Sequence, residues 1–334
     1  MSNYKTIDIH AHILPEETIG LLQKTAPSLA LRIQPLDESS GILEIAGITQ
    51  KPFPREAWDL ELRFRDMDKS QVDVHLLSNT PQTFLYEQEA SLGAECAEIQ
   101  NDQIASLVGK YPERFRGLAT LPMQAPEMAA RELRRAMGSG GLLGFHLASN
   151  IAGRNLDDPA LEPVWEAAGE LGAFVLVHPF GIAAADRLKS YYLKNLIGNP
   201  LDTTIAAASL IFGGVIERHP AINFCFAHGG GFTPYQAGRF IHGWNVRPEP
   251  KQFLKRGPAE SLGRIYYDTI LHSDAMLQLL IGSVGASRVM LGSDYPFDMG
   301  YYEGVRQVRS LAIPESDQAL ILGKTAKALL RMAS

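Results

Sequence analysis

GLLGFHLASNIAGRNLDDPALEPVWEAAGELGAFVLVH, residues 141–178, contains two short apolar runs separated by a longer helix-like stretch. The runs Gly141–Leu147 and Ala173–Val177 are short and rich in β-branched or aromatic residues, which is typical of strands. Asp158–Leu171 lies between them and has the length of a helix. The segment therefore predicts a strand–helix–strand unit of a parallel sheet.

The same alternation extends along the chain in both directions. The other candidate strands are Thr6–Ile9, Val72–Leu77, Phe115–Leu121, Asn223–Ala227, Ile265–Ile270 and Val289–Gly292. The other helix-like stretches are Gln88–Tyr111, Pro126–Ala136, Thr204–Glu217, Met276–Val284, Glu303–Leu311 and Asp317–Met332. Nearly continuous hydrophobicity indicates strands buried on both faces. Eight strands that alternate with helices predict an α/β fold, a (β/α)8 TIM barrel spanning residues 1–334 as one domain, rather than a doubly wound sheet of fewer strands.

Residues 15–56 do not fit this alternation. They separate the first strand from the second and are too long for an ordinary strand-to-helix loop. Parts of the segment are polar and contain glycine and proline, as in 34–41 and 51–54. We therefore expect an insertion or lid between the first and second strands.

Composition excludes several classes of protein. The 334 residues are 46% hydrophobic and 20% charged, which is ordinary for a globular chain. The net charge of −6 and the absence of a basic run argue against a nucleic-acid partner. No apolar run reaches the roughly 18 residues that a membrane span needs. The N-terminal residues lack the apolar core of a signal peptide, and the two cysteines, Cys96 and Cys225, cannot form a disulfide framework, so we expect a cytoplasmic location.

Ionisable residues follow the apolar runs at four predicted strand ends. His10 and His12 are two residues apart, so their side chains point the same way in a strand. His178, His228 and Asp294 each end a later strand. The carboxyl ends of barrel strands converge on one mouth, where active sites are built. Histidine and carboxylate ligands there suit a catalytic Zn²⁺, and Mn²⁺ or Fe²⁺ would also fit.

Three further residues lie near the same predicted mouth. His146 ends the fourth strand, Asp268 ends the seventh and His272 follows it. Each can contact the substrate or support the residues that do, and each can equally be structural. The glycines 229–231 lack the pattern of a phosphate loop and permit a tight turn after His228.

Four motifs carry a resemblance to a known family. They are Asp8-Ile-His-Ala-His-Ile-Leu-Pro15, Val177-His-Pro, Phe226-Ala-His-Gly-Gly-Gly231 and Met290-Leu-Gly-Ser-Asp-Tyr-Pro-Phe297. In this order and spacing the chain resembles the amidohydrolase superfamily, and more closely its aminocarboxymuconate-semialdehyde decarboxylase branch. That branch binds one metal and has no carboxylated lysine on the fourth strand, and Gly141–Leu147 contains no lysine.

The resemblance implies roles for individual residues. It implies that the metal is held by His10, His12, His178 and Asp294. It implies that His228 is the acid/base residue, and that Asp294 helps to set the protonation of a metal-bound water.

The resemblance also implies substrate contacts and a homodimer. Arg239 matches an arginine that reaches a substrate carboxylate across the dimer interface. Lys51 stands at the place of a family arginine, and Phe180 and Tyr191 replace family tryptophans. These replacements leave the metal chemistry intact, but they mean that the resemblance does not identify aminocarboxymuconate semialdehyde as the substrate. His146 is a further candidate substrate contact.

The resulting hypothesis is an enzyme that decarboxylates an unsaturated or hydroxylated aromatic carboxylic acid without oxidation, with one divalent metal, Zn²⁺ or alternatively Mn²⁺. Arg239 or Lys51 would hold a carboxylate of this small-molecule substrate. A second hypothesis keeps the site and makes the enzyme a hydrolase of an amide, lactone or C–C bond, or a hydratase. A third is a binding or scaffold protein that has lost catalysis, against which the intact ligand set argues.

Overall fold

The computed structural model describes residues 4–332, and it confirms the predicted α/β fold. Parallel strands form a three-stranded sheet in the order β1-β5-β6 and a five-stranded sheet in the order β11-β10-β9-β8-β7. Their bounds are β1 (Ile7–Ile13), β5 (Val74–Asn79), β6 (Phe115–Gly117), β7 (Gly144–Ala148), β8 (Phe174–His178), β9 (Asn223–Phe226), β10 (Tyr266–Asp268) and β11 (Val289–Met290). Each coincides with a predicted strand, although β6, β10 and β11 are shorter than expected.

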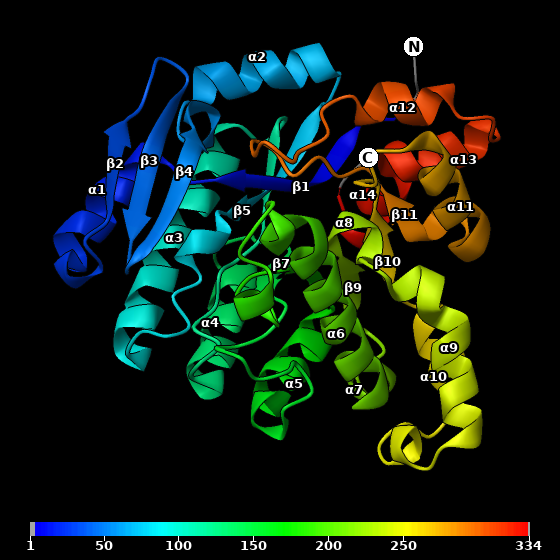
Figure 1. Ribbon diagram of the computed structural model, residues 1–334. Helices are drawn as coiled ribbons and strands as arrows, with labels where there is room; N and C mark the ends of the chain where they lie inside the picture. Colours follow the sequence, from blue (N-terminus) through cyan, green and yellow to red (C-terminus); the bar gives the residue numbers. More distant parts are fainter. Residues whose placement is uncertain (1–3, 333–334) are drawn as a thin grey trace.

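The two parallel sheets meet at both of their edges. Ala119, just beyond β6, forms a parallel bridge with Phe145 of β7, and Ala11 of β1 forms one with Tyr295, beyond β11. The backbone N–H of Ile9 donates to the carbonyl of Leu291 at 2.9 Å. The helices surround the strands in Figure 1. This is the architecture of the TIM-barrel family.

Alternate side chains of the strands belong to two different cores. In β8, Phe174 and Leu176 pack in an inner cluster, while Val175 and Val177 pack in the larger cluster beneath the helices. The period of two is that of a strand buried on both faces. It places His178, the last residue of β8, on the inner side.

Each of the seven predicted stretches contains helix, but helices over residues 60–70, 227–230, 233–246 and 258–262 were not predicted. The helices are α2 (Leu60–Ser70), α3 (Ala90–Lys110), α4 (Pro126–Gly138), α5 (Glu162–Leu171), α6 (Asn199–Phe212), α7 (Val215–Arg218), α8 (Ala227–Gly230), α9 (Thr233–Val246), α10 (Pro258–Leu262), α11 (Asp274–Val284), α12 (Gly304–Ser310), α13 (Glu315–Ala319) and α14 (Thr325–Leu329). The closing stretch, predicted as one helix, is divided by a π-helical turn at Leu320–Lys324. Among the described helices, none has both the length and the apolar character to cross a membrane.

The insertion after β1 is an ordered unit. It comprises α1 (Glu16–Thr25) and an antiparallel sheet of β2 (Arg32–Pro35), β3 (Ser40–Ile45) and β4 (Ile48–Pro54). Leu43, Phe53 and other buried residues pack in a cluster that also includes Leu85 and Cys96 of the barrel, so the insertion is anchored on it. It lies at one side of the barrel, in blue in Figure 1. The predicted insertion is therefore present.

Candidate metal centre

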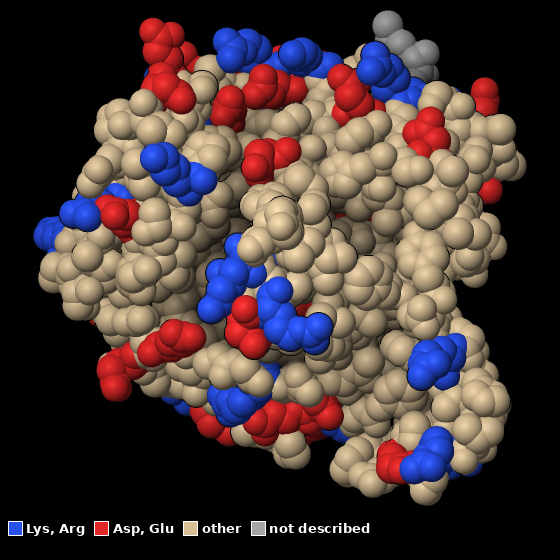
Figure 2. All heavy atoms as spheres, in the orientation of Figure 1, with Lys and Arg blue, Asp and Glu red and all other residues tan. Residues whose placement is uncertain are grey.

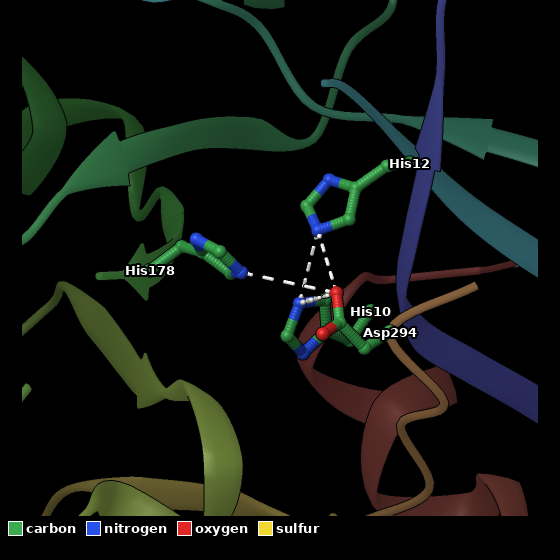
Figure 3. Close-up of side chains that lie close together, drawn as sticks. All are labelled: His10, His12, His178 and Asp294. Carbon is green, nitrogen blue, oxygen red and sulfur yellow. Dashed lines mark hydrogen bonds and ion pairs between the residues drawn. The ribbon is translucent and has the colours of Figure 1, made fainter. Parts of the chain in front are cut away.

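A β-bulge turns the two N-terminal histidines toward the barrel axis. Ile7 and Ile9 pack in the inner cluster, so strict alternation would send His10 and His12 outward. The register between β1 and β5 shifts between Asp8 and Ala11. Such an extra residue re-aims the side chains that follow it. His10 and His12 consequently point to the same place as His178 (Figure 3).

Asp294 reaches this place from the segment after β11. Its backbone is left-handed, with φ of 58°, a conformation that aspartate tolerates better than most residues. Its N–H donates to the carbonyl of His10 at 2.9 Å, which joins the segment to β1. Close packing beneath the site needs a glycine, since a Cβ on Gly292 would lie 2.8 Å from the Cβ of Asp268.

The four side chains converge on one point. Asp294 Oδ1 lies 3.4 Å from His10 Nε2, 3.2 Å from His12 Nε2 and 3.8 Å from His178 Nε2. The two Nε2 atoms of His10 and His12 are 3.1 Å apart. Ligands bound tetrahedrally at about 2.1 Å are separated by roughly 3.4 Å. The spacing therefore matches the edges of a metal coordination tetrahedron.

Outer partners leave the Nε2 atoms free to bind a metal. His10 donates from Nδ1 to Asp268 Oδ2 at 2.8 Å. His12 donates from Nδ1 to Ser78 Oγ at 3.1 Å, and Ser78 is itself oriented toward the carbonyl of Ala11. Each bond fixes the tautomer whose lone pair is on Nε2.

The electrostatics of the cluster call for a cation. Burial lowers the pKa of His12 to about 4 and that of His178 to about 3, so both rings are neutral. Burial also opposes charge on His10, but the carboxylates of Asp294 and Asp268 raise its pKa to about 10. Burial would raise the pKa of Asp294, yet the positive charge of His10 and the closeness of the other imidazoles hold it well below its ordinary value. The carboxylates thus favour a positive charge at this point, and either a proton on His10 or a divalent cation would supply it.

The donor atoms pass a direct test of fit. His178 Nε2 and Asp294 Oδ1 are buried without a hydrogen-bond partner among the described residues. Buried polar atoms without partners are costly, so their alignment on one point indicates a missing ligand. His10, His12, His178 and Asp294 form a four-residue divalent metal site.

His228 lies beside the cluster and shares an anchor with it. Its Nε2 is 3.3 Å from Asp294 Oδ2. Its left-handed backbone, with φ of 56°, donates from N–H to Asp268 Oδ2 at 2.9 Å, and Gly229 donates to Asp268 Oδ1 at 2.7 Å. Hydrogen bonding and charge from His10 lower the pKa of Asp268 despite its burial. One carboxylate therefore orients both a metal ligand and the acid/base candidate.

A cavity of about 470 Å³ opens next to His178 and Asp294. Phe180 and Phe297 provide aromatic wall, while Gln50 and Gln82 provide amide groups. Gln82 Nε2 donates to Gln50 Oε1 at 3.2 Å, which joins the insertion to the barrel beside the cavity. An enclosure of this kind suits a small unsaturated or aromatic acid.

The predicted substrate-binding residues lie in different places. Phe180 lines the cavity. His146 is buried between His12 and His178, with ring-centroid distances of 5.1 and 5.5 Å, and neither of its ring nitrogens has a hydrogen-bond partner within residues 4–332.

Lys51, Tyr191 and Arg239 are exposed and do not line this cavity of their own chain. The cavity is lined instead by Gln50, which precedes Lys51, and by Tyr192, which follows Tyr191.

Several contributors to the site escape sequence reasoning. Gln82 and Lys194 line the cavity but belong to none of the quoted motifs, and Phe297 ends one of them without having been assigned a role. In the structure, Ser78 is identified as part of the site by its contact with His12. In the sequence, its place at the end of the second barrel strand was the one signal that pointed to it.

Comparisons with known proteins agree with this geometry. Residues 7–332 match the family described as Amidohydrolase. The chain is 37% identical over 295 residues to 2-amino-3-carboxymuconate-6-semialdehyde decarboxylase of Dictyostelium discoideum, covering 88% of this chain and 82% of that protein. The crystal structure of 5-carboxyvanillate decarboxylase from Sphingomonas paucimobilis is similar at a TM-score of 0.83 and 25% identity, covering 99% of this chain and 100% of that one.

A related crystal structure was determined with a metal. It is 5-carboxyvanillate decarboxylase from Novosphingobium aromaticivorans, complexed with manganese and 4-hydroxy-3-methoxy-5-nitrobenzoic acid, with a TM-score of 0.83 and 22% identity over 99% of this chain and 97% of that one. Together with the family match, the likeness to the Dictyostelium enzyme confirms the resemblance predicted from the four motifs. The chain belongs to the amidohydrolase family, in its branch of metal-dependent decarboxylases.

Proposed function

We propose that this carboxy-lyase removes CO2 from an unsaturated or hydroxylated aromatic carboxylic acid without oxidation. The observation that carries the proposal is the cluster of three imidazoles and one carboxylate, with His228 Nε2 only 3.3 Å from Asp294. The apolar walls of the adjoining cavity and the kinship with decarboxylases support the same reaction.

The metal ligands in this proposal are His10, His12, His178 and Asp294, and the cation is Zn²⁺, with Mn²⁺ as the alternative. Three neutral imidazoles and a carboxylate suit Zn²⁺, whereas one structural relative was crystallised with manganese. When bound, a divalent cation supplies a Lewis acid that polarises substrate oxygens.

Side chains of the protein transfer the protons and position the substrate. His228 delivers a proton from Nε2 to the carbon that bears the carboxylate. Protonation interrupts the conjugation of the substrate, and the electron pair of the breaking C–C bond restores it as CO2 departs. Asp294 accepts and returns protons beside the metal. Phe180 holds the planar substrate against the cavity wall, and His146 offers a ring nitrogen to a substrate oxygen.

The proposal extends to the whole chain. Residues 1–334 act as one cytoplasmic catalytic unit built on a complete (β/α)8 barrel, with residues 15–56 as its lid. The hydrogen bond between Gln50 and Gln82 is the contact that such a lid makes with the barrel.

A homodimer is part of the same proposal. Arg239 is exposed on α9, and Phe232, Tyr235 and Val246 expose apolar surface at positions 37%, 40% and 59% accessible on or beside that helix. A second copy that covers this surface could receive Arg239 at its substrate carboxylate. Tyr191, 86% exposed, and Lys51 would meet substrate only in such an assembly or after closure of the lid. Light scattering of the purified protein should report a mass twice that of the chain.

The test is metal analysis combined with a CO2-release assay. Purified protein should contain one Zn²⁺ or Mn²⁺ per chain and release CO2 from a panel of hydroxybenzoates, 5-carboxyvanillate and a carboxymuconate semialdehyde. Acid release from amides or lactones without CO2 would replace this proposal with hydrolysis, and addition of water to a double bond would replace it with hydration. Protein with neither metal nor turnover would refute catalysis altogether.

A further inference from the structure

The substrate cavity contains a single lysine or arginine, and it is not one that the family resemblance indicates. Among the residues lining the cavity, Lys194 alone carries a permanent positive charge. A second cavity of about 330 Å³, which reaches His228 and shares Asn195 and Asn199 with the first, has no lysine or arginine in its lining. Among residues 4–332, Lys194 is thus the one lysine or arginine that lines either cavity and can meet a substrate anion away from the metal.

The Lys194 ammonium is available for such a contact. Within residues 4–332, no hydrogen bond or ion pair engages its side chain. The one exposed carboxylate on the same cavity lining, Asp298, is near Tyr192, whose pKa burial and this carboxylate both raise. No ion pair joins Asp298 to Lys194 among the described residues, so the ammonium is not neutralised by this carboxylate.

The backbone around Lys194 is built irregularly, as at many functional sites. Lys194 begins a π-helical turn, Lys194–Gly198, immediately before α6. Tyr191 and Tyr192 just ahead of it both have left-handed backbones, with φ of 57° and 58°. Figure 2 shows basic side chains at the centre of this face, next to its hollow. An irregular turn that brings a lysine to a cavity rim is consistent with a recognition role rather than a packing role.

We propose that Lys194 is a specificity-determining residue that selects substrates with a second anionic group, a carboxylate remote from the bond that breaks. The inference rests on the proposed function, because it takes the leaving carboxylate to lie near His178 and Asp294. A flat ring against Phe180 and Phe297 then carries its second carboxylate toward Lys194. The side chain is exposed, so the contact is a solvent-screened, charge-assisted hydrogen bond of modest strength.

The experiment compares a monoanion with a dianion of the same ring. Calorimetry on metal-loaded protein at low ionic strength measures the affinities of benzoate and isophthalate. The wild type should bind isophthalate about three- to tenfold more tightly. Lys194→Met should remove that preference and change benzoate affinity less than twofold, and Lys194→Arg should retain it. Lys189→Met is the matched control, because Lys189 is exposed on the same segment but does not line the cavity.

Three results would overturn the inference. These are no preference for isophthalate in the wild type, a preference that survives in Lys194→Met, and a preference lost in Lys51→Met instead. The proposed function fails separately, if no acid in the panel releases CO2 while the affinity difference persists. Conversely, CO2 release without any charge preference would refute only the role of Lys194.

Discussion

Replacement of Asp268 by asparagine should weaken metal binding although Asp268 is not a metal ligand. Its Oδ2 accepts from His10 Nδ1 at 2.8 Å and from the N–H of His228 at 2.9 Å. Its Oδ1 accepts from the N–H of Gly229 at 2.7 Å and of Ile270 at 3.1 Å. An asparagine amide keeps one acceptor oxygen and presents a donor where the other stood, so two of these four donors lose their partner.

The expected magnitudes follow from those contacts. Each buried donor left unsatisfied costs about 1–3 kcal/mol, so the free energy of unfolding should fall by roughly 2–6 kcal/mol. If the amide nitrogen faces His10, it favours the tautomer with hydrogen on Nε2, which cannot bind a metal. Loss of such an outer partner typically lowers metal affinity about 10- to 100-fold.

The assay measures Zn²⁺ affinity by competition with a chelator, and urea unfolding of the metal-free protein reports stability separately. Asp186→Asn is the control, because Asp186 is exposed and makes none of these bonds. If Asp268→Asn folds only poorly, Ser78→Ala tests the same reasoning through His12, whose Nδ1 it leaves without its 3.1 Å acceptor. Wild-type metal affinity in both variants would refute the claim that these partners orient the ligands.

Three more outcomes are expected. His228→Asn keeps a residue that tolerates the left-handed backbone, and it should lower CO2 release about 10²- to 10⁴-fold with unchanged metal content by elemental analysis; loss of metal would contradict the separation of roles. Asp294→Ala should remove metal and turnover together, and retention of both would refute its assignment. Burial and the charge of Arg63 hold the pKa of His75 well below its ordinary value. Below pH 6.5 the unfolded chain therefore binds a proton that folded His75 does not, and stability falls as pH falls. In urea unfolding at pH 7.5 and 5.5, His75→Gln should lose about 1.4 kcal/mol less than the wild type, and equal losses would count against a neutral buried His75.

Sequence reasoning succeeded where one local pattern sets the structure. Short apolar runs are sufficient to locate strands that are buried on both faces, and the polar residues that end them mark the barrel mouth. It could not foresee the bulge between Asp8 and Ala11, although that bulge is what turns His10 and His12 inward. The prediction that they share a face was confirmed, because the extra residue lies between Asp8 and Ala11 and does not separate His10 from His12 in direction.

The lining of the cavity was less predictable, for a physical reason. In an extended strand, neighbouring side chains point to opposite faces, so an alignment that differs by one residue exchanges inside for outside. Gln50 lines the cavity while Lys51 is exposed, and the pair differs by one position on β4. Lys194 lies on an irregular turn that has no hydrophobic period to locate it.

The insertion contributes to the wall of the substrate cavity but provides none of the four metal ligands. Leu14 and Ala57 flank the insertion, and the N–H of Leu14 donates to the carbonyl of Ala57 at 2.8 Å, so the polypeptide leaves the barrel and rejoins it at adjacent points. Segments of very different length can bridge so small a gap at little entropic cost. A graft that replaces residues 15–56 would exchange the wall containing Gln50 and leave in place the ligands on β1, at the end of β8 and after β11. In evolution and in the laboratory, replacement of this one segment can thus change the substrate while the metal site stays the same.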